Sequence, residues 1–577
     1  MPDILHNAKT ENKNSKNIFI TGDNLDALKH LENAYTSKVD VIYIDPPYNT
    51  GGDDFVYHDN FKFTDEDLAV KLGLNEKEIE RVRALDGKSS HSAWLTFMYP
   101  RLVIAKRLLK DTGVIFISID DNEQANLKLL CDEVFGEGNF VGDFIRKTKS
   151  QTNDAKAGLN YQHEFVLIYA RKAEQFLMKG EIKNTDNYKN PDNDPAGAWV
   201  IADPSARSGG ESGRFEIINP YTNTVDLPPQ GRYWAFAKST FEKWVKSGKV
   251  VFRKEIKDGQ RGFIIKKYLA ELRSDYNLVD SLYFTDKQFM NQSATKYMNE
   301  LFAKEDLSFD YPKPVEFVRK LLQYSTQKDS LILDFFAGSG TTADAVMQLN
   351  KEDGGSRNYI LVQLDEKVKA GSEAEKHGYK TIDEISRERI KKASEKIASA
   401  HSFELDSKSP NLFETMGQAC NDVMDLGFKS FYLKTPNITT LEKIEEFVPS
   451  EELFVDDMIS PFSAENLQVN GGADGVSTLL TTWLLDDGYP FDSKLERIEF
   501  GGQAIAYKNG SRLYILDKKW DTEATKDLLN RIGKNEMIIS TIIVYAYSLE
   551  FEALRELKTN LKTNLDEDHK VELLKRF

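Results

Sequence analysis

Asp45 begins a short motif, Asp45-Pro46-Pro47-Tyr48, that directly follows the apolar run VIYI. Each proline fixes its backbone φ and lacks an N–H, and Pro46 drives Asp45 toward an extended conformation. The main-chain carbonyls remain as acceptors, so the motif forms a rigid ledge of acceptors beside the ring of Tyr48. Such a ledge fits a flat group that carries an amino group. These residues therefore predict a site for the exocyclic amine of a nucleobase.

An exocyclic amine attacks poorly because its lone pair is delocalised into the ring. Accepting hydrogen bonds from both of its hydrogens favours the pyramidal nitrogen that attack requires. Asp45 would supply the main electrostatic stabilisation, and stacking on Tyr48 would hold the base. The alternative interpretation of the motif is an edge strand that is stopped by proline beside a chance aspartate.

A second motif, LILDFFAGSGTT, places Asp334 at the end of an apolar strand and turns through Gly338 and Gly340 into a helix. Glycine in such a turn lets the backbone approach a ligand closely. A carboxylate at this point suits a cationic amino-acid group or a ribose, and it does not suit a pyrophosphate. The motif also lacks the GK[ST] of a phosphate-binding loop. The alternative is a tight turn without a ligand.

Both motifs need strands that end at one edge of a sheet, and the sequence around them alternates strand and helix patterns. Strands are expected at 17–23, 39–45, 114–120 and 164–171, and helices at 24–35, 94–113 and 122–136. The alternation resumes at 330–350 and 358–366 and ends with a helix at 382–399. This order predicts an α/β fold with a parallel sheet.

Turn-forming clusters such as NPDNDPAG and LPPQGRYW break the alternation between about 172 and 300. This stretch is expected to be an insertion. The predicted domains are therefore two halves at 1–171 and 301–400, the insertion at 172–300, and a separate acidic C-terminal domain at 401–577.

The net charge of −16 at first argues against a polyanionic partner, but the charge is unevenly spread. Residues 141–300 hold 25 basic against 20 acidic side chains, and residues 243–267 hold nine against two, interleaved with Trp244, Phe252 and Phe263. This composition is typical of a nucleic-acid interface, although a solvated basic surface is the competing interpretation.

Other classes of protein are excluded by composition. Two cysteines, neither in a CxxC pair, give no disulfide framework or zinc ribbon. The histidines form no HExxH, and His163-Glu164 is expected to serve packing or a local hydrogen bond rather than a metal. No apolar run is long enough to span a bilayer, and the first residues lack a signal peptide, so we expect a cytoplasmic protein without a membrane partner.

Together the two motifs resemble those of the amino-methyltransferases that methylate DNA bases from S-adenosylmethionine, in which DPPY is the catalytic motif and FxGxG the cofactor motif. The catalytic motif comes first here, which is similar to the permuted β-group of that family. The resemblance implies a Rossmann-like, circularly permuted methyltransferase sheet, an inserted target-recognition domain at 172–300, and an α+β C-terminal domain. TGDNL at 21–25, YPKPVEFVRKLL from Tyr311 and YILVQLDE at 359–366 match further family segments.

The resemblance implies roles for individual residues. Asp45, Pro46, Pro47 and Tyr48 would contact the target base, and no metal is implied. Asp23 would lie near the adenine of the cofactor, Lys313 near its carboxylate and Asp334 near its methionine part, while Gln363 or Asp365 would bind the ribose. The implied cofactor site further includes Asn24, Phe336, Gly338, Ser339, Gly340 and Thr341. Candidates for phosphate or base-edge contacts with DNA are Arg207, Arg214, Lys249, Arg253, Lys254, Arg261, Lys266 and Lys267.

Several segments between residues 18 and 400, including DPPYNTGGDDFVYHDNF and GVIFISIDDNE, resemble the modification subunit of a type III restriction-modification system. This resemblance implies an N6-adenine methyltransferase that acts on double-stranded DNA. It further implies a homodimer and a separate ATP-dependent restriction subunit as partner. The adenine would be flipped out of the duplex, because N6 inside a base pair cannot meet both a methyl donor and the acceptor ledge.

Three alternatives remain open at this point. Cytosine N4 presents the same conjugated amine to the same ledge, although an aspartate before the prolines favours adenine. A non-catalytic DNA-recognition subunit would retain the fold without the chemistry, but a decayed site would be expected to lose one of its motif residues. A protein or ribosomal methyltransferase would be expected to begin with the cofactor motif and to carry asparagine before the prolines.

Overall fold

The computed structural model describes residues 1–49, 64, 68–69, 73–85, 90–151, 159–302, 312–407, 424–436, 440, 458–563 and 570–576. Residues 50–52 of the first motif's loop and Tyr311 lie outside the described residues. The chain divides into two compact units, one made of residues 1–177 with 280–577 and one made of residues 178–279, which we call the inserted unit.

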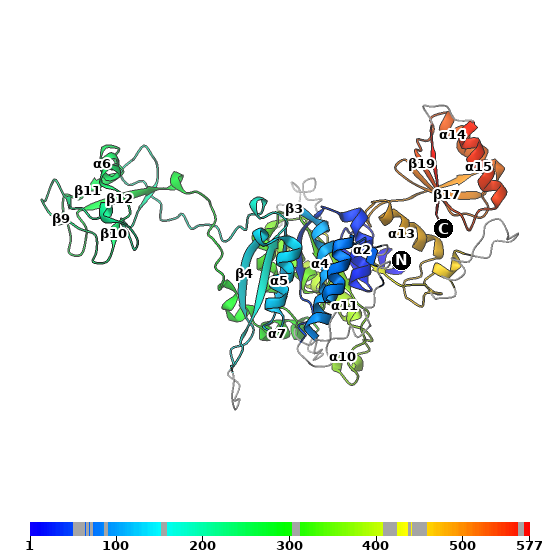
Figure 1. The fold of residues 1–577 in the computed structure, drawn as a ribbon, viewed down its shortest axis with the longest axis horizontal. Helices are drawn as coiled ribbons and strands as arrows, with labels where there is room; N and C mark the ends of the chain where they lie inside the picture. The colour runs from blue at the N-terminus through cyan, green and yellow to red at the C-terminus, as the bar shows by residue number, and fades with distance from the viewer. Residues whose placement is uncertain are drawn as a thin grey trace. The chain divides into compact units, whose positions relative to one another are not determined.

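An eight-stranded sheet lies at the centre of the first unit, with helices packed against it (Figure 1). Its order is β15-β1-β14-β13-β2-β3-β5-β4. The strands from β15 to β3 pair in parallel, and β5 pairs antiparallel with both β3 and β4. The bounds are β15 Lys429–Tyr432, β1 Ile18–Thr21, β14 Asn358–Gln363, β13 Leu331–Asp334, β2 Val39–Ile44, β3 Leu109–Ile119, β5 His163–Ala170 and β4 Phe140–Lys147. The predicted α/β fold is confirmed.

Helices cover both faces of this sheet, because successive side chains of a buried strand point to opposite sides. Ile42 and Ile44 of β2 pack in one apolar core with α2 (Asn24–Tyr35), α4 (Ser90–Leu108) and α5 (Gln124–Phe135). Tyr43, between them, meets Phe317 of α8 (Val315–Ser325), with ring centroids 6.1 Å apart. The remaining helices of this part are α1 Ile4–Asn7, α3 Glu76–Leu85, α7 Asn291–Leu301, α9 Thr341–Asp353, α10 Glu373–Lys376 and α11 Ile382–Ser407.

Two element boundaries differ from the prediction. The helix expected at 94–113 ends at Leu108, and β3 begins at Leu109, which pairs with Val39 across a register shift. β15, from the predicted C-terminal domain, instead pairs with β1 as the edge of the large sheet. Edge pairing of this kind is set by contacts that are distant in sequence, so local patterns do not reveal it.

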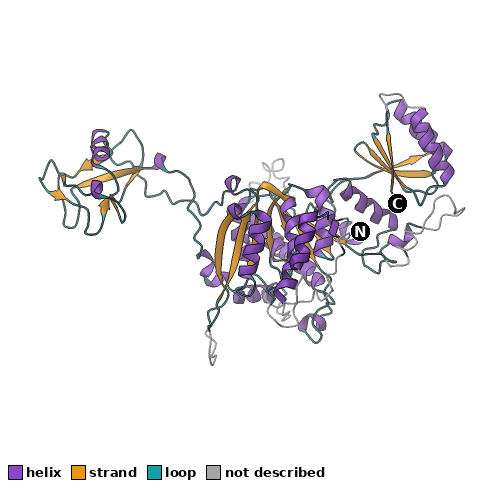
Figure 2. Ribbon diagram, in the orientation of Figure 1, coloured by secondary structure: helices purple, strands orange, loops and turns teal. Residues whose placement is uncertain are grey.

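The inserted unit is built from short strands (Figure 2). They surround an aromatic core. The three-stranded antiparallel sheet of this unit has the order β11-β12-β6, and Phe263 of β12 packs in one core with Trp234, Phe236 and Phe241. The bounds are β6 Trp199–Ile201, β7 Ser205–Ala206, β8 Ile217–Ile218, β9 Val225–Asp226, β10 Tyr233–Trp234, α6 Lys238–Lys246, β11 Val250–Phe252 and β12 Phe263–Tyr268. Residues 172–177 and 280–300, which were predicted to belong to the insertion, group with the first unit.

The C-terminal part contains a second mixed sheet of order β16-β17-β18-β19-β20 with helices beside it. Its elements are α13 Gly475–Asp486, β16 Glu496–Phe500, β17 Ala504–Asn509, β18 Arg512–Ile515, α14 Thr522–Gly533, β19 Thr541–Tyr545, α15 Phe551–Thr563 and β20 Glu572–Arg576. The α+β character expected of this part is confirmed. No helix among the described residues has the length and apolar character needed to cross a bilayer.

Candidate active site

The two sequence motifs meet because β2 and β13 are neighbouring parallel strands. Ile42 of β2 pairs with Leu333 of β13, so Asp45 and Asp334 follow at the same edge of the sheet. From β13 the chain continues through α9 to β14 on one side, and from β2 it continues to β3 on the other. This is a point where the strand order reverses, the usual place for ligands in such sheets.

A cavity of about 700 Å³ opens at this edge. Both motifs line it, through Asp45, Pro46, Pro47 and Tyr48 on one side and Asp334, Phe336, Gly338, Ser339 and Thr341 on the other. A volume of several hundred Å³ is typical of sites for small organic ligands.

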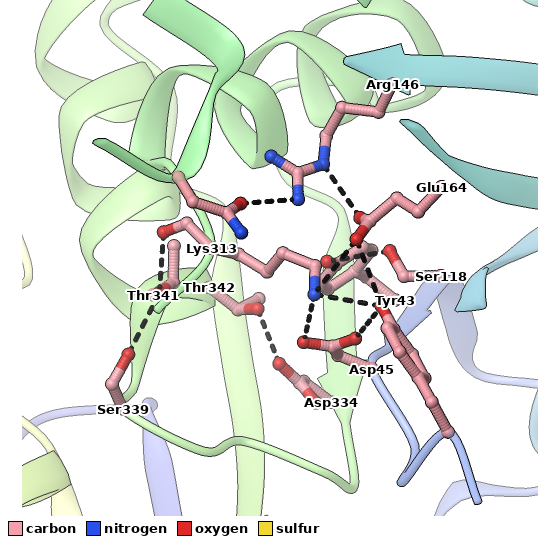
Figure 3. A network of polar contacts seen from close by, with 12 residues as sticks. Tyr43, Asp45, Ser118, Arg146, Glu164, Lys313, Asp334, Ser339, Thr341 and Thr342 are labelled. Atoms are coloured by element: carbon pink, nitrogen blue, oxygen red, sulfur yellow. Dashed lines mark hydrogen bonds and ion pairs between the residues drawn. The ribbon is translucent and has the colours of Figure 1, made fainter. Parts of the chain in front are cut away.

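Asp45 is held by two donors from the protein itself (Figure 3). The hydroxyl of Tyr48 donates to its Oδ1 at 2.7 Å, and the ammonium of Lys313 donates to its Oδ2 at 2.7 Å. Burial and the charge of Asp45 raise the pKa of Tyr48 well above its usual range, so this hydroxyl remains a donor. The resemblance implied that Lys313 lies at the cofactor's carboxylate, whereas its ammonium lies on the catalytic motif.

Pro47 ties the motif to α4. The indole Nε1 of Trp94, a fully buried residue, donates to the Pro47 carbonyl at 2.7 Å. One of the carbonyls expected to serve as an acceptor for a ligand is therefore used to anchor the ledge. Asn49, whose φ of 55° is left-handed, adds a second anchor through its amide, which donates to Glu123 at 2.6 Å.

A buried ion pair lies behind Asp45. Arg146 of β4 donates through Nε to Glu164 of β5 at 2.7 Å, and the two side chains are 0% and 6% exposed. Burial would raise the pKa of Glu164, but the charges of Arg146 and Lys313 outweigh it and hold that pKa below its usual range. Glu164 thus remains ionised in the interior, within 3.7 Å of the Lys313 ammonium.

The cofactor motif forms a tight turn in which Gly338 and Gly340 have φ of 51° and 77°. The N–H of Gly338 donates to the side-chain oxygen of Gln363 at 2.7 Å. From α11, the fully buried guanidinium of Arg389 donates to the hydroxyls of Ser339 and Thr341, each at 2.6 Å. The loop is therefore fixed from β14 on one side and from α11 on the other.

Among the described residues, the buried carboxyl of Asp334 is stabilised only by two neutral hydrogen-bond donors. Its carboxylate accepts from the hydroxyl of Thr342 at 2.5 Å and from the N–H of Phe336 at 3.0 Å. Burial raises the pKa of Asp334 to about 7. A carboxyl in this state is suited to receive a cationic group from a ligand, which would restore its ionised form.

Five predicted cofactor residues lie outside the lining of this cavity, and one of them is Gly340 of the glycine turn. Asp23 caps α2 by accepting from the N–H of Leu25, and Asn24 donates to the carbonyl of Phe335 at 3.0 Å. Gln363 contacts the glycine turn, as described above, and Asp365 forms an ion pair with Lys434.

The predicted DNA contacts lie in the inserted unit and differ in exposure. Arg207, Arg214, Lys254 and Lys267 are exposed, whereas Lys249, Arg253 and Arg261 are half-buried. Lys266 is a correction: its side chain is only 4% exposed and is bound by Asp192 and Asp194. Because Lys266 and Lys267 are successive residues of β12, they point to opposite faces, and only Lys267 offers its charge to a partner.

The sequence did not single out Glu164 and Arg146 as parts of this site. His163-Glu164 was expected to serve packing or a local hydrogen bond, and Arg146 was given no role. The available signal was a carboxylate inside the otherwise apolar strand HEFVLIYA, since a charge at a buried position needs a partner. That partner lies on a neighbouring antiparallel strand, opposite Glu164 in the register.

Comparisons with known proteins decide the family. A family model described as DNA methylase matches residues 39–384, and a second, described as the type III R-M EcoP15I C-terminal domain, matches residues 474–571. The StyLTI Mod subunit of Salmonella typhimurium strain LT2 is 42% identical, over 100% of this chain and 86% of its own length. The chain belongs to the Mod subunits of type III restriction-modification enzymes.

Two further relatives agree. The Mod subunit of the type III enzyme EcoPI of Escherichia phage P1 is 35% identical, and that of EcoP15I of Escherichia coli is 33% identical. Each alignment covers 97% of this chain and 84% of the relative. The expectation that the Mod-family chain is a DNA methyltransferase is confirmed.

Proposed function

We propose that this chain transfers a methyl group from S-adenosylmethionine to N6 of an adenine in double-stranded DNA. The observation that carries the proposal is the single cavity shared by Asp45 and Asp334, which are 289 positions apart in the sequence. A base-binding ledge beside a carboxyl suited to a cation matches the two partners of such a transfer. The methyl donor and the attacking amine then lie within one site.

The described residues fit this cofactor. When bound, S-adenosylmethionine supplies an electrophilic methyl group. Asp334 would pair with the ammonium of its methionine part, because a buried carboxyl with a raised pKa gains most from a cation. The turn at Gly338–Gly340 would let the backbone approach the cofactor. Of the two candidates for the ribose, we favour Gln363, because its side chain contacts the glycine turn that would hold the cofactor, whereas Asp365 is paired with Lys434.

The target base would lie on the Asp45 ledge. Asp45 would accept from the amino group and stabilise the positive charge that develops on nitrogen during attack. The ring of Tyr48 would stack on the base. An amine in a paired base cannot reach this ledge, so the adenine would leave the duplex.

The competing target is cytosine N4, which presents the same conjugated amine. Sequencing that detects methylated bases in DNA from cells expressing this chain separates the two. We expect N6-methyladenine at one short DNA sequence. N4-methylcytosine at that position would overturn the choice of adenine, and DNA without any methylation would overturn the proposal.

Variants test the residues within the same assay. Asp45→Ala should abolish methylation and leave cofactor binding in place, whereas Asp334→Ala should weaken cofactor binding itself, measured by calorimetry. Asp111→Ala is the matched control, because Asp111 is an exposed aspartate paired with Lys172 and does not line the cavity. A fully active Asp45→Ala variant would exclude a catalytic role for Asp45.

The inserted unit and the C-terminal part are the candidate regions for binding DNA and other protein chains. We propose that the inserted unit reads DNA, supported by its exposed arginines and lysines. We also propose that the chain forms a homodimer and binds an ATP-dependent restriction subunit, supported by the match of residues 474–571 to the C-terminal domain of a type III enzyme. Mass measurement in solution, with and without the restriction subunit, tests both assemblies.

A further inference from the structure

Each carboxylate oxygen of Asp45 already accepts from a donor of the protein. Tyr48 donates to Oδ1 and Lys313 to Oδ2, each at 2.7 Å. An arriving amino group has to donate to this same carboxylate. Lys313 is only 8% exposed, so solvent does not offer its ammonium an equivalent place. Lys313 also donates to the hydroxyl oxygen of Tyr48 at 2.9 Å, but this oxygen carries no charge. For the full charge of Asp45 to face the amine, Lys313 therefore needs a second charged acceptor inside the protein.

Glu164 provides this acceptor. Its Oε2 lies 3.7 Å from the ammonium of Lys313 and 3.4 Å from the hydroxyl of Tyr48. Both donors that occupy Asp45 therefore share one alternative partner, which needs only a small movement of each. The other oxygen of Glu164, Oε1, is held by Arg146. Asp45, Lys313, Glu164 and Arg146 thus form one charged cluster, in which Oε2 of Glu164 faces Lys313 (Figure 3).

Arg146 keeps Glu164 in place while Lys313 moves. Its guanidinium is fully buried and donates to the carbonyl of Phe289 at 2.6 Å and to the side chain of Asn291 at 2.8 Å. The cluster contains two carboxylates and two cations. A shift of Lys313 from Asp45 to Glu164 therefore leaves the net charge of the cluster unchanged, and no ion has to leave the interior.

We propose that Lys313 is a displaceable placeholder on Asp45, and that Glu164 is the positioning residue that receives it when the amino group of the target base arrives. The inference rests on the proposed methyl transfer to an amino group. In this structure Lys313 compensates the charge of Asp45. After the shift, Asp45 accepts from the amine and its charge faces the nitrogen that becomes positive during attack.

The test begins with Glu164→Gln, which keeps the shape of the side chain and removes the charge that attracts Lys313. Methyl transfer to unmethylated DNA from the expression host is measured with labelled S-adenosylmethionine at saturation. We expect kcat to fall by about tenfold or more, because Lys313 then stays on Asp45. The affinity for S-adenosylmethionine should stay close to that of the wild type.

The decisive variant adds Lys313→Met to Glu164→Gln. If Lys313 blocks the ledge, removing its charge should raise kcat at least about fivefold above that of Glu164→Gln alone, at saturating cofactor. A merely structural role of Glu164 predicts no such recovery, because the second substitution would only add to the damage. Thermal unfolding shows whether each variant is folded. If Glu164→Gln does not fold, Glu164→Asp replaces it, which withdraws the carboxylate by one methylene, and the same recovery is expected.

Three results would overturn the inference. One is a Glu164→Gln variant with the wild-type rate, and another is a slow variant that Lys313→Met does not rescue. Both leave the proposed function intact, since the wild-type chain still methylates DNA. A wild-type chain that binds S-adenosylmethionine but methylates no DNA would instead overturn the proposed function, and the placeholder with it.

Discussion

Asp45 and Asp334 are both aspartates at the carboxyl end of a parallel strand, but their partners differ in charge. Asp45 accepts from the ammonium of Lys313, whereas Asp334 accepts from the neutral donors Thr342 and Phe336. Burial without a cation in contact raises the pKa of Asp334 to about 7. Pairs of carboxyls with different surroundings can serve different roles in one site.

The raised pKa of Asp334 predicts a pH dependence of stability. Because its folded-state pKa lies above the ordinary 3.8, the neutral carboxyl stabilises the fold at low pH. This contribution is lost as the pH rises from about 4 toward 7 and changes no further above that pKa. Asp334→Asn cannot ionise, so its thermal midpoint should rise relative to that of the wild type over this window.

Thermal unfolding of both proteins at pH 5, 6, 7 and 8 without cofactor measures the effect. Asp111→Asn serves as the exposed control. A difference between wild type and Asp334→Asn that stays constant with pH would contradict the assigned pKa shift.

At the scale of elements, α11 supports the cofactor turn although it lies outside both sequence motifs. Arg389 of this helix binds the hydroxyls of Ser339 and Thr341, and Ser386 donates to the carbonyl of Gly338. A turn with two left-handed glycines has few conformational restraints of its own. Contacts from a packed helix supply the missing restraints and preorganise the turn for its ligand.

Replacing Arg389 tests this support. Arg389→Met should weaken the binding of S-adenosylmethionine by about tenfold, because the turn would lose two hydrogen bonds to a charged donor. Calorimetry on the full chain measures the affinity. Arg387→Met is the matched control: Arg387 lies on the same helix and pairs with Asp383 and Tyr432 away from the turn. Equal losses in both variants would show that only the stability of α11 matters.

At the scale of the whole molecule, a chain with a net charge of −16 carries its candidate DNA contacts on one separate unit. Nucleic-acid affinity depends on local cations rather than on net charge, so the acidic total does not oppose this assignment. Local charge is also partly neutralised, as Lys249 is paired with Glu271 and Lys266 with two aspartates. Exposed cations such as Lys254 and Lys267 remain as the stronger candidates.

Adjacent lysines of β12 provide a matched test. Lys267→Ala should flatten the dependence of log affinity for DNA on log salt concentration by about one unit for a lost phosphate contact. Lys266→Met should leave this slope unchanged and should instead lower the thermal midpoint, because it leaves Asp192 and Asp194 without their cation. DNA binding titrated at several salt concentrations measures the slope. Equal slopes for wild type and Lys267→Ala would remove this strand from the interface.

Sequence patterns by themselves determined the α/β class, the two motifs and the presence of an insertion. These features are local. The prolines of DPPY and the glycines of DFFAGSG indicate, from the sequence alone, how the chain turns after each apolar strand. The family also follows from these motifs, and the comparisons confirm it.

Only the tertiary structure decided how the charges are paired. It brought Lys313 onto Asp45, set Glu164 and Arg146 behind them, and buried Lys266 while leaving Lys267 exposed. Asp45 and its partner Lys313 are 268 positions apart in the sequence. Electrostatic pairing depends on distance in space and on burial, and neither is encoded in the spacing of residues along the chain.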